Sequence, residues 1–270
     1  MTQSTMERPK VATRDGWLAA RKELLAKEKQ HTRAGDALAA ERRNLPWVKV
    51  EEEYVFDTPR GKKKLADLFE GRSQLIVYHF MFAPEWEEGC PSCSILGDHI
   101  DGSVMHLANR DVTLIAVSRA PLAKIEEFKK RMGWRFKWAS SFGSAFNWDY
   151  HVSFTKEEVE KKEMYYNFGR GAFPSEEGPG VSVFYKNANG EVFHTYSSYG
   201  RGVEPLMGVY SYMDLTPRGR HEEGLPFPMA WRRHHDKYEQ DYYVDGPAAS
   251  SLEQKAESAG GSCCGGETKG

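Results

Sequence analysis

The chain has 270 residues, of which 40% are apolar and 28% charged, enough for one large domain with attachments or for two small domains. Its 37 basic and 39 acidic side chains leave a formal charge of −2, so no long-range field favours nucleic acid or an anionic membrane as a partner. Only four cysteines are present, which excludes a scaffold stapled by disulfides.

No targeting or membrane-spanning segment is expected. The N-terminus, Met1 to Lys10, is polar and has no hydrophobic signal region. The longest apolar run, within 75–83, is interrupted by His79 and is too short to cross a bilayer. We therefore expect a cytoplasmic protein.

Residues 14–44 are predicted to form a helical arm. Thr13 or Asp15 can cap it, and its apolar residues fall on one stripe among many charged ones. Gly35 is expected to divide the segment into two helices before Pro46 stops it. A solvated arm packed on one face is one interpretation, and a dimerisation arm that would make the protein a homodimer is the other.

Short strands at 47–50 and 54–56 are predicted next, followed by a basic turn at 60–64 and a short helical turn at 65–69. The basic turn is typical of a solvated loop. Residues 74–82 give the strongest strand signal, because a strand covered on both faces is apolar almost throughout.

The next part of the chain is predicted to alternate between helix and strand. The loop 83–89 delivers Cys90 to the start of a helix that we expect to end near Leu107. A second buried strand at 112–117 leads into a helix opened by Pro121. Strands that alternate with helices in this rhythm imply parallel pairing through right-handed crossovers.

The rest of the core is predicted to be antiparallel. Strands at 181–185 and 191–196 flank a turn containing Asn189 and Gly190, which is a strong hairpin signal, and a last helix is expected over 203–212. The fold class is therefore α/β, with a mixed sheet flanked by helices.

Composition divides the chain into four parts. We expect an N-terminal helical arm over 1–45, the sheet domain over 46–216, a C-terminal extension that wraps the core over 217–245, and a disordered tail over 246–270. Gly, Ser, Ala and Glu dominate that tail, and such a composition cannot bury enough apolar surface to fold.

A Cys-Pro-Ser-Cys motif carries the chemistry. Residues three apart on a helix have Cβ atoms roughly 5–6 Å apart, which suits a reversible disulfide. The charge and free N–H groups of a helix N-terminus favour a thiolate at Cys90, and Pro91 stands where a helix tolerates proline best. Glu87 and Glu88 oppose this, so we expect a moderate lowering of the Cys90 pKa. We expect Cys90 to be the exposed attacking thiolate and Cys93 the more buried resolving thiol.

Zinc binding is the main rival interpretation of this cysteine pair, but a zinc site needs a second pair of ligands. Cys263 and Cys264 stand about 170 residues away in the predicted tail, and His99 and His106 lie beyond the first turn of the helix. We therefore predict no metal. No nucleotide or flavin motif is visible, so no cofactor is expected either.

Cys263 and Cys264 form a second pair, for which three roles are open. As a flexible coil, the tail from residue 246 has an r.m.s. span of roughly 23 Å, against a radius of gyration of about 18 Å for a domain of this size. It can therefore reach Cys90 and shuttle electrons to it by thiol–disulfide exchange. Metal capture and an inert tail are the alternatives.

Three residues could support the motif. Arg119 follows the second parallel strand, so it should emerge at the same sheet edge and could stabilise the Cys90 thiolate or bind an anionic substrate. A surface or loop-anchoring arginine is the alternative. Trp86 could shelter the site, form a substrate platform or simply pack. His79 could serve as a base, although a histidine in a core strand is more often structural.

Short stretches across roughly residues 8–240 carry a family resemblance, namely 79–82, 87–93, 111–121, 131–136, 140–144, 183–185, 192–196, 214–217 and 228–231. They resemble the DUF899 family of thioredoxin-like proteins, which are predicted to be dithiol–disulfide oxidoreductases. The resemblance implies a thioredoxin-like fold related to the alkyl hydroperoxide reductase and peroxiredoxin branch, with Cys90 and Cys93 as its catalytic pair.

The chain departs from both related groups. Peroxiredoxins place a proline seven residues and a hydroxyl residue three residues before the reactive cysteine, whereas here Pro84 is six residues before Cys90 and Glu87 takes the hydroxyl position. Thioredoxins have a cis-proline before the strand that faces the motif; here Pro179 precedes Gly180 and that strand, so this proline is either displaced or absent. Phe80 replaces the buried acid of thioredoxin's central strand. A peroxidase is therefore disfavoured. Either other residues bind the substrate chain and relay the proton, or the protein reduces no protein disulfides.

The sequence predicts a thioredoxin-like dithiol–disulfide oxidoreductase. In this hypothesis Cys90 attacks a protein or small-molecule disulfide, Cys93 resolves the mixed disulfide, and an external thiol reductant recycles the pair. A thiol-dependent peroxidase and a non-catalytic binding protein that retains the fold are the alternatives.

Overall fold

The structure is a computed structural model that describes residues 10–238. Its helices are α1 (Arg14–Arg43), α2 (Pro91–Asn109), α3 (Leu122–Arg131), α4 (Phe146–Asp149), α5 (Lys156–Lys161) and α6 (Gly208–Met213), with 3-10 helices η1 (Leu65–Phe69), η2 (Gly200–Leu206) and η3 (His235–Lys237). Its strands are β1 (Val48–Lys49), β2 (Val55–Thr58), β3 (Gly61–Lys64), β4 (Gln74–His79), β5 (Val112–Ser118), β6 (Lys137–Ser140), β7 (Met164–Tyr166), β8 (Gly169–Gly171), β9 (Gly180–Lys186) and β10 (Val192–Tyr199). Cys263 and Cys264, like the predicted tail, lie outside the described residues.

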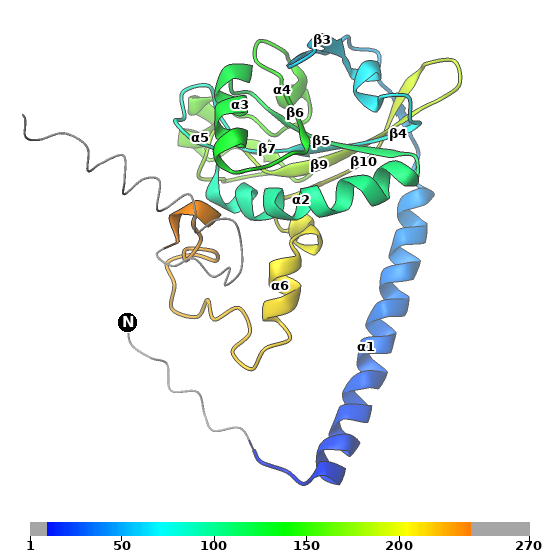
Figure 1. Cartoon of the computed structure of the whole chain (residues 1–270), viewed down its shortest axis with the longest axis vertical. Helices are drawn as coiled ribbons and strands as arrows, with labels where there is room; N and C mark the ends of the chain where they lie inside the picture. The colour runs from blue at the N-terminus through cyan, green and yellow to red at the C-terminus, as the bar shows by residue number, and fades with distance from the viewer. Residues whose placement is uncertain (1–9, 239–270) are drawn as a thin grey trace, which may run out of the picture. The chain divides into compact units, whose positions relative to one another are not determined.

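One eight-stranded sheet organises the domain, in the order β1-β10-β9-β4-β5-β6-β2-β3 (Figure 1). β4, β5 and β6 run parallel, with α2 and α3 as their crossovers. β9 pairs antiparallel with β4, and β10 pairs antiparallel with β9. Parallel strands joined by helices and extended by an antiparallel hairpin form the predicted α/β, thioredoxin-like fold, which is confirmed.

β4 lies at the centre of the sheet because both of its faces are apolar. Leu75 and Val77 pack into one hydrophobic cluster, while Tyr78 and Phe80 pack into the other. Burying each such side chain stabilises the fold by about 1.5–3 kcal/mol. The strand ends at His79, three residues earlier than predicted, where its pairing with β9 ends opposite Gly180.

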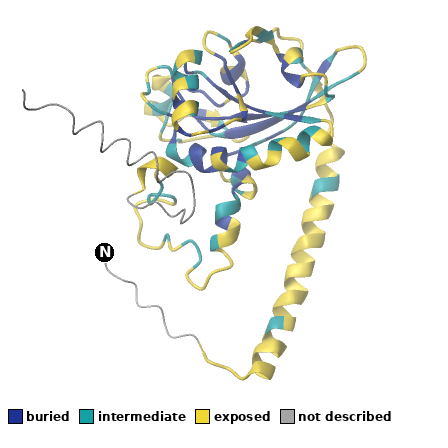
Figure 2. Cartoon of the chain, in the orientation of Figure 1, coloured by how far each residue is buried: buried dark blue, intermediate teal, exposed yellow. Residues whose placement is uncertain are grey.

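The helical arm is one helix, α1, rather than two. Thr13 caps it, since its hydroxyl accepts the Gly16 N–H at 3.2 Å. The prediction that Gly35 divides it is wrong, because one glycine costs about 1 kcal/mol and the good helix formers around it outweigh that. No α1 residue is buried, as the exposed colouring of this helix in Figure 2 shows. Trp17, for example, is 49% exposed. The expected packing of its apolar stripe is therefore not found within residues 10–238.

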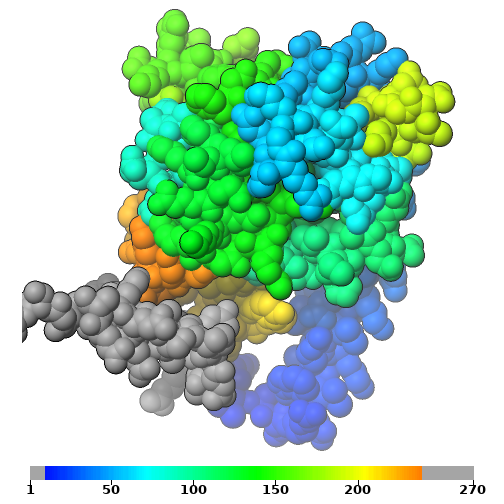
Figure 3. All heavy atoms as spheres, turned by 45° about the horizontal axis from the view of Figure 1, so that its top comes forward, coloured from blue at the N-terminus to red at the C-terminus, as the bar shows by residue number. Residues whose placement is uncertain are grey.

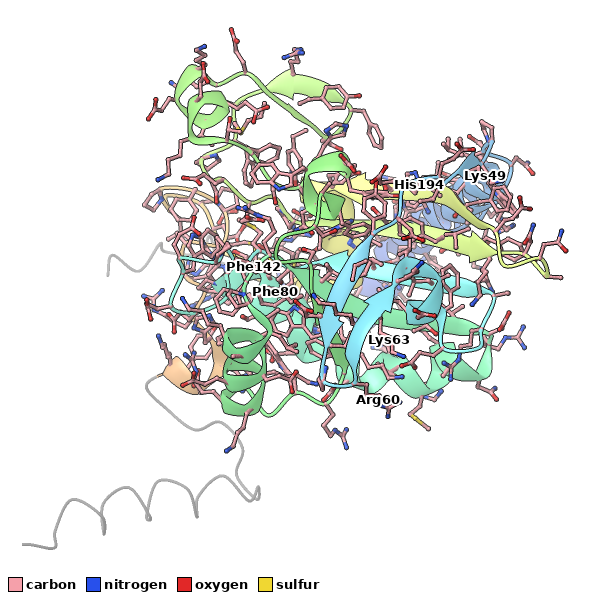
Figure 4. The ribbon with its side chains drawn as sticks, turned by 90° about the horizontal axis from the view of Figure 1, so that it is seen from above. Lys49, Arg60, Lys63, Phe80, Phe142 and His194 are labelled. Carbon is pink, nitrogen blue, oxygen red and sulfur yellow. The ribbon has the colours of Figure 1, made fainter. Side chains whose placement is uncertain are left out.

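The basic segment 60–64 is largely a strand, where a turn was predicted. β3 pairs with β2 so that Lys63 stands opposite Phe56, and the turn ends at Gly61, whose φ is +90°. An edge strand tolerates lysines because they keep it from pairing with other chains. Figure 3 shows this hairpin on the surface, beside the green segment that contains α3 and β6. Arg60 and Lys63 (Figure 4) line a cavity of about 670 Å³ there.

The C-terminal part is more broken than predicted. Where one helix over 203–212 was expected, η2 and α6 follow one another, and Pro205 lies inside η2. Proline lacks the N–H that an α-helix needs there. The chain after α6 is mostly irregular, and its Met229 and Trp231 pack against the core. Contacts within the chain divide it into two compact units, and the boundary between them follows Arg232.

Candidate active site

The loop after β4 delivers Cys90 to the N-terminus of α2. Cys90 caps the helix, Pro91 is its first residue, and Cys93 lies in its first turn. The Cys90 N–H donates to the Met81 carbonyl at 3.0 Å, while the N–H and the hydroxyl of Ser94 each donate to the Cys90 carbonyl at 3.0 Å. These bonds hold Cys90 beyond the carboxyl end of a central parallel strand, which is where open α/β sheets place their sites.

Both thiols are buried, with Cys90 at 9% exposure and Cys93 at 2%. The prediction that Cys90 is exposed is therefore wrong, although Cys90 is the more accessible of the two. The two cysteines belong to one hydrophobic cluster, against which Trp86, Phe173 and Trp231 pack. Phe173 and Trp231 come from segments far along the chain, so no local pattern indicated this cover.

Hydrogen bonds hold the pKa of Cys90 below its ordinary value. The Cys93 thiol lowers it most, the backbone N–H groups of Cys93 and Ser92 lower it further, and so does the charge of Arg232, while burial acts in the opposite direction. Burial raises the pKa of Cys93 well above its ordinary value, and the neighbouring Cys90 adds to that rise. Of the two thiols, Cys90 is therefore the one that ionises more readily.

This arrangement predicts an acid-shifted pH profile for Cys90. Alkylation by iodoacetamide should be half-maximal near pH 6, because the pKa of Cys90 is lowered to about 6. An unperturbed thiol is half ionised only near pH 8.5, at about its reference pKa. Mass spectrometry of the Cys90 peptide after timed labelling measures this rate, and a midpoint at about 8.5 or above would contradict the prediction.

Two tyrosines that belong to no sequence motif lie near Cys93. The buried Tyr78 hydroxyl donates to the Cys93 carbonyl at 3.4 Å, and burial raises the pKa of Tyr78 well above its ordinary value. The Tyr166 hydroxyl donates to the Pro179 carbonyl at 2.5 Å and accepts the Gly200 N–H at 2.8 Å. The alternation of side chains along β4 could have indicated that Tyr78 faces α2. No local sequence pattern indicates that Tyr166 lies near the site.

Arg119 emerges after β5 as predicted, but Glu177 binds its guanidinium. Arg119 Nε donates to Glu177 Oε1 at 2.6 Å, and the guanidinium lies 4.5 Å from the Trp148 ring centroid. Glu177 is 1% exposed and also accepts a hydrogen bond from the Ser153 hydroxyl at 2.9 Å. Burial raises the pKa of Glu177 to about 7, against the opposing effects of Arg119 and Ser153. This placement favours the anchoring role of Arg119 over a contact with Cys90.

His79 lies on the face of β4 opposite Tyr78. Its Nε2 shares a hydrogen bond with the Ser182 hydroxyl at 2.8 Å, and Ser182 is linked to Ser197 at 2.8 Å. His194 (Figure 4) closes this chain through Ser197 at 2.7 Å. Burial lowers the pKa of His79 to about 3, so the ring is neutral near pH 7. These contacts favour a structural role for His79 over that of a base for the thiols.

Comparison with known proteins identifies the family. The profile of the family described as "Bacterial protein of unknown function (DUF899)" matches residues 6–238. The chain belongs to the DUF899 family. No curated protein matches this DUF899 chain.

Solved structures match the DUF899 protein at low identity. A cysteine mutant of peroxiredoxin Q from Xanthomonas campestris has a TM-score of 0.40 and 13% identity, covering 58% of this chain and 90% of that one. A PrxQ mutant from Xylella fastidiosa has a TM-score of 0.37 and 13% identity, covering 59% and 89%. A Chlorobium tepidum protein provisionally named thiol:disulfide interchange protein DsbE has a TM-score of 0.38 and 12% identity, covering 62% and 94%. Similarities of this size carry no conclusion about activity.

The loop before Cys90 in the DUF899 protein is held in place by contacts with α3. Trp86 is half-buried against the thiol cluster, and its carbonyl accepts from Lys124 Nζ at 3.1 Å. Lys124 also binds the Pro84 carbonyl at 3.0 Å, so α3 holds the loop in place.

No peptide bond within residues 10–238 is cis, and the bond to Pro179 is therefore trans.

No group of three His, Cys, Asp or Glu side chains in the described part of the DUF899 chain could hold a metal ion. Nor does any helix there combine the length and the apolar character needed to cross a membrane.

Proposed function

We propose that this DUF899 protein is a dithiol–disulfide oxidoreductase that acts through Cys90 and Cys93. One observation carries the proposal: Cys90 caps α2, and the Cys93 thiol and two backbone N–H groups stabilise its sulfur as a thiolate. A thiolate is the nucleophile in disulfide exchange, and the thiol one helical turn away stands where a resolving group is needed.

The proposed reaction has two steps. The Cys90 thiolate attacks one sulfur of a substrate disulfide, which forms a mixed disulfide and releases the other substrate sulfur as a thiolate. Cys93 then loses its proton to that thiolate and attacks the Cys90 sulfur, so that the Cys90–Cys93 disulfide forms and the second substrate sulfur leaves as a thiolate, which solvent can protonate. Two electrons pass from the protein to the substrate. An external thiol reductant reverses the oxidation of the cysteine pair.

A cytoplasmic location would suit this cycle, because thiols are kept reduced there. The substrate is proposed to be a protein or a small-molecule disulfide. Glu87 is exposed and carries a carboxylate where a peroxidase would place a hydroxyl, so no contact of this site favours peroxide as the substrate.

Stopped-flow mixing with a chromogenic aromatic disulfide tests the proposal. The protein should carry Cys263→Ser and Cys264→Ser, so that the reaction reports only on the motif. We expect a fast phase that releases aromatic thiolate and is about tenfold faster near pH 6 than that of an unperturbed thiol, because the larger thiolate fraction outweighs its lower nucleophilicity.

The matched control is the same chain with Cys90→Ser, in which the fast phase should vanish. Hydrogen peroxide in the second syringe should react slowly. A faster reaction with peroxide than with the disulfide would favour the peroxidase, and slow reaction with both would remove both enzymatic functions.

A further inference from the structure

The cavity beside the β2–β3 hairpin lies where two strands stop pairing. β2 pairs with β6 only at Asp57, which stands opposite Ser140. Pro59, two residues further on, has no N–H with which to continue the ladder. The end of the hairpin and the start of β6 therefore stay unpaired. Residues of the hairpin, η1, α3 and β6 line the cavity of about 670 Å³ between them.

Positive charge is concentrated in this cavity. Among the described residues, six cationic and two acidic side chains line it, namely Arg60, Lys63, Arg72, Lys129, Arg135 and Lys137 with Asp67 and Glu70. Their formal charges leave +4, whereas the whole chain carries −2. A concave surface of one sign attracts ligands of the other, so the cavity favours an anion although the chain as a whole does not.

Three of the six cations already have carboxylate partners. Glu70 forms an ion pair with Lys137 and lies 4.0 Å from Arg72. Arg135 Nε lies 3.5 Å from Asp101 Oδ2, outside the lining. These charges are partly neutralised within the protein, so the charge left for a ligand comes from the other three cations.

Arg60, Lys63 and Lys129 form no ion pair within residues 10–238. Arg60 lies in the hairpin turn, Lys63 in β3 and Lys129 in α3, and Figure 4 shows the first two on the hairpin. The remaining acid of the lining, Asp67, accepts the Lys64 N–H at 2.9 Å and so caps η1. Cations from three parts of the chain thus meet at one cavity without a carboxylate of their own.

The rest of the lining favours a small molecule over a macromolecule. Leu68, Ile115 and Trp138 are buried and also line the cavity, and apolar surroundings strengthen the interaction between charges. The volume lies within the range of small-molecule sites, roughly 300–1,000 Å³. A nucleic acid is bound by a basic stripe on an open face, whereas these charges line a concave site.

We propose that this cavity binds a small polyphosphate and that Arg60, Lys63 and Lys129 hold its phosphate groups. A phosphate group carries about −1.5 to −2 charges at pH 7, so two or three in a chain match the charge of the lining. Arginine binds two phosphate oxygens at once, and lysine binds phosphate as a point charge. Neither Cys90 nor Cys93 lines the cavity, so this site is separate from the proposed redox site.

Titration calorimetry of the full chain with inorganic tripolyphosphate tests the proposal. We expect one binding site whose affinity falls as salt is added, because salt screens the charges. Lys63→Met and Lys129→Met keep an aliphatic side chain and remove the charge. Each should raise the dissociation constant about tenfold, as the loss of one hydrogen bond to a charged group predicts. Arg60→Lys should weaken binding less than Arg60→Met, because it keeps the charge and loses only the fork.

The matched controls are Lys62→Met and Lys130→Met. Lys62 and Lys130 are exposed, each follows or precedes a lysine of the cavity in the chain, and neither lines it. These substitutions remove the same charge from the same elements, so the dissociation constant should stay nearly unchanged. Equal losses in the cavity variants and the control variants would overturn the proposal, because they would show a general effect of net charge.

Two further ligands define the source of the phosphates. ATP that displaces tripolyphosphate and binds more tightly would assign the site to a nucleotide, and ATP that binds equally or more weakly would assign it to the phosphate chain alone. Both results support a polyphosphate site. A single-stranded DNA oligonucleotide that binds more tightly than either, with the same loss in cavity and control variants, would overturn it in favour of a nucleic-acid surface.

The unchanged protein gives the most direct result. A native chain that shows no saturable binding of tripolyphosphate at low ionic strength would overturn the proposal. Circular dichroism checks that each variant folds. If Lys63→Met does not fold, Lys129→Met on the surface of α3 decides in its place, and a dissociation constant equal to that of Lys130→Met would then overturn the assignment.

Discussion

Replacing Cys93 by serine should stop turnover and trap Cys90 in a mixed disulfide with its substrate. The attacking thiolate remains in Cys93→Ser, although it loses the thiol that lowers its pKa most, so attack should be slower but still present. The second step has no thiol left and should fall below detection. Non-reducing electrophoresis and peptide mapping after reaction with a disulfide substrate measure the trapped species.

Cys90→Ser is the matched control and should trap nothing, because Cys93 is more deeply buried and its pKa is raised. Mapping of the Cys93→Ser chain also tests the proposed electron shuttle, which predicts a disulfide between Cys90 and Cys263 or Cys264. Stable adducts on Cys93 in Cys90→Ser, at the rate seen for the unchanged protein, would reverse the assigned roles.

Adding one methyl group just before the motif should both destabilise the protein and slow its thiol. A Cβ at Gly89 would stand 2.6 Å from Phe80 Cε1 and 2.7 Å from Phe128 Cε1, which is closer than carbon atoms approach. Phe80 and Phe128 belong to the buried aromatic cluster and have little room to move. Gly89→Ala should therefore lower the free energy of unfolding by about 1–3 kcal/mol and displace Cys90 from the α2 N-terminus.

Urea denaturation measures the loss of stability in Gly89→Ala, and alkylation of Cys90 measures the displacement. Gly102→Ala is the control, because nothing lies within 4 Å of a Cβ at that position inside α2. It should stabilise the chain by about 0.5–1 kcal/mol, since alanine favours a helix over glycine, and leave the thiol unchanged. Equal effects of the two substitutions would show that the aromatic rings do not restrict Gly89.

Local sequence patterns predicted the central strand, the hairpin turn and the start of α2, because each pattern reflects the burial or backbone conformation of its own residues. The apolar run at 74–79 marks a strand covered on both faces, and the Asn189-Gly190 turn lies between β9 and β10 as predicted. Pro91 at the first position of α2 likewise marks a helix start. Each signal lies within a few residues of the feature that it predicts.

The predictions that failed depend on competition between local and distant effects. Gly35 does not divide α1, because the small cost of one glycine is spread over a long helix. The basic segment 60–64 forms β3, because pairing with β2 and a turn at Gly61 outweigh its charge. In both cases the residues around the segment, and for β3 the pairing with β2, outweighed the signal on which the prediction was based.

At the thiol site, local sequence predicted some features, whereas others depend on tertiary packing. Cys90 before a proline, at the junction of an apolar strand and a helix, was enough to place the cysteine pair at the N-terminus of α2 and to predict the lowered pKa of Cys90. The cover over Cys90, the nearby Tyr166 and the charge of Arg232 arise from packing between segments far apart in the chain. Burial and electric field at a sulfur atom depend on every neighbour in space, so they emerge only once the chain has folded.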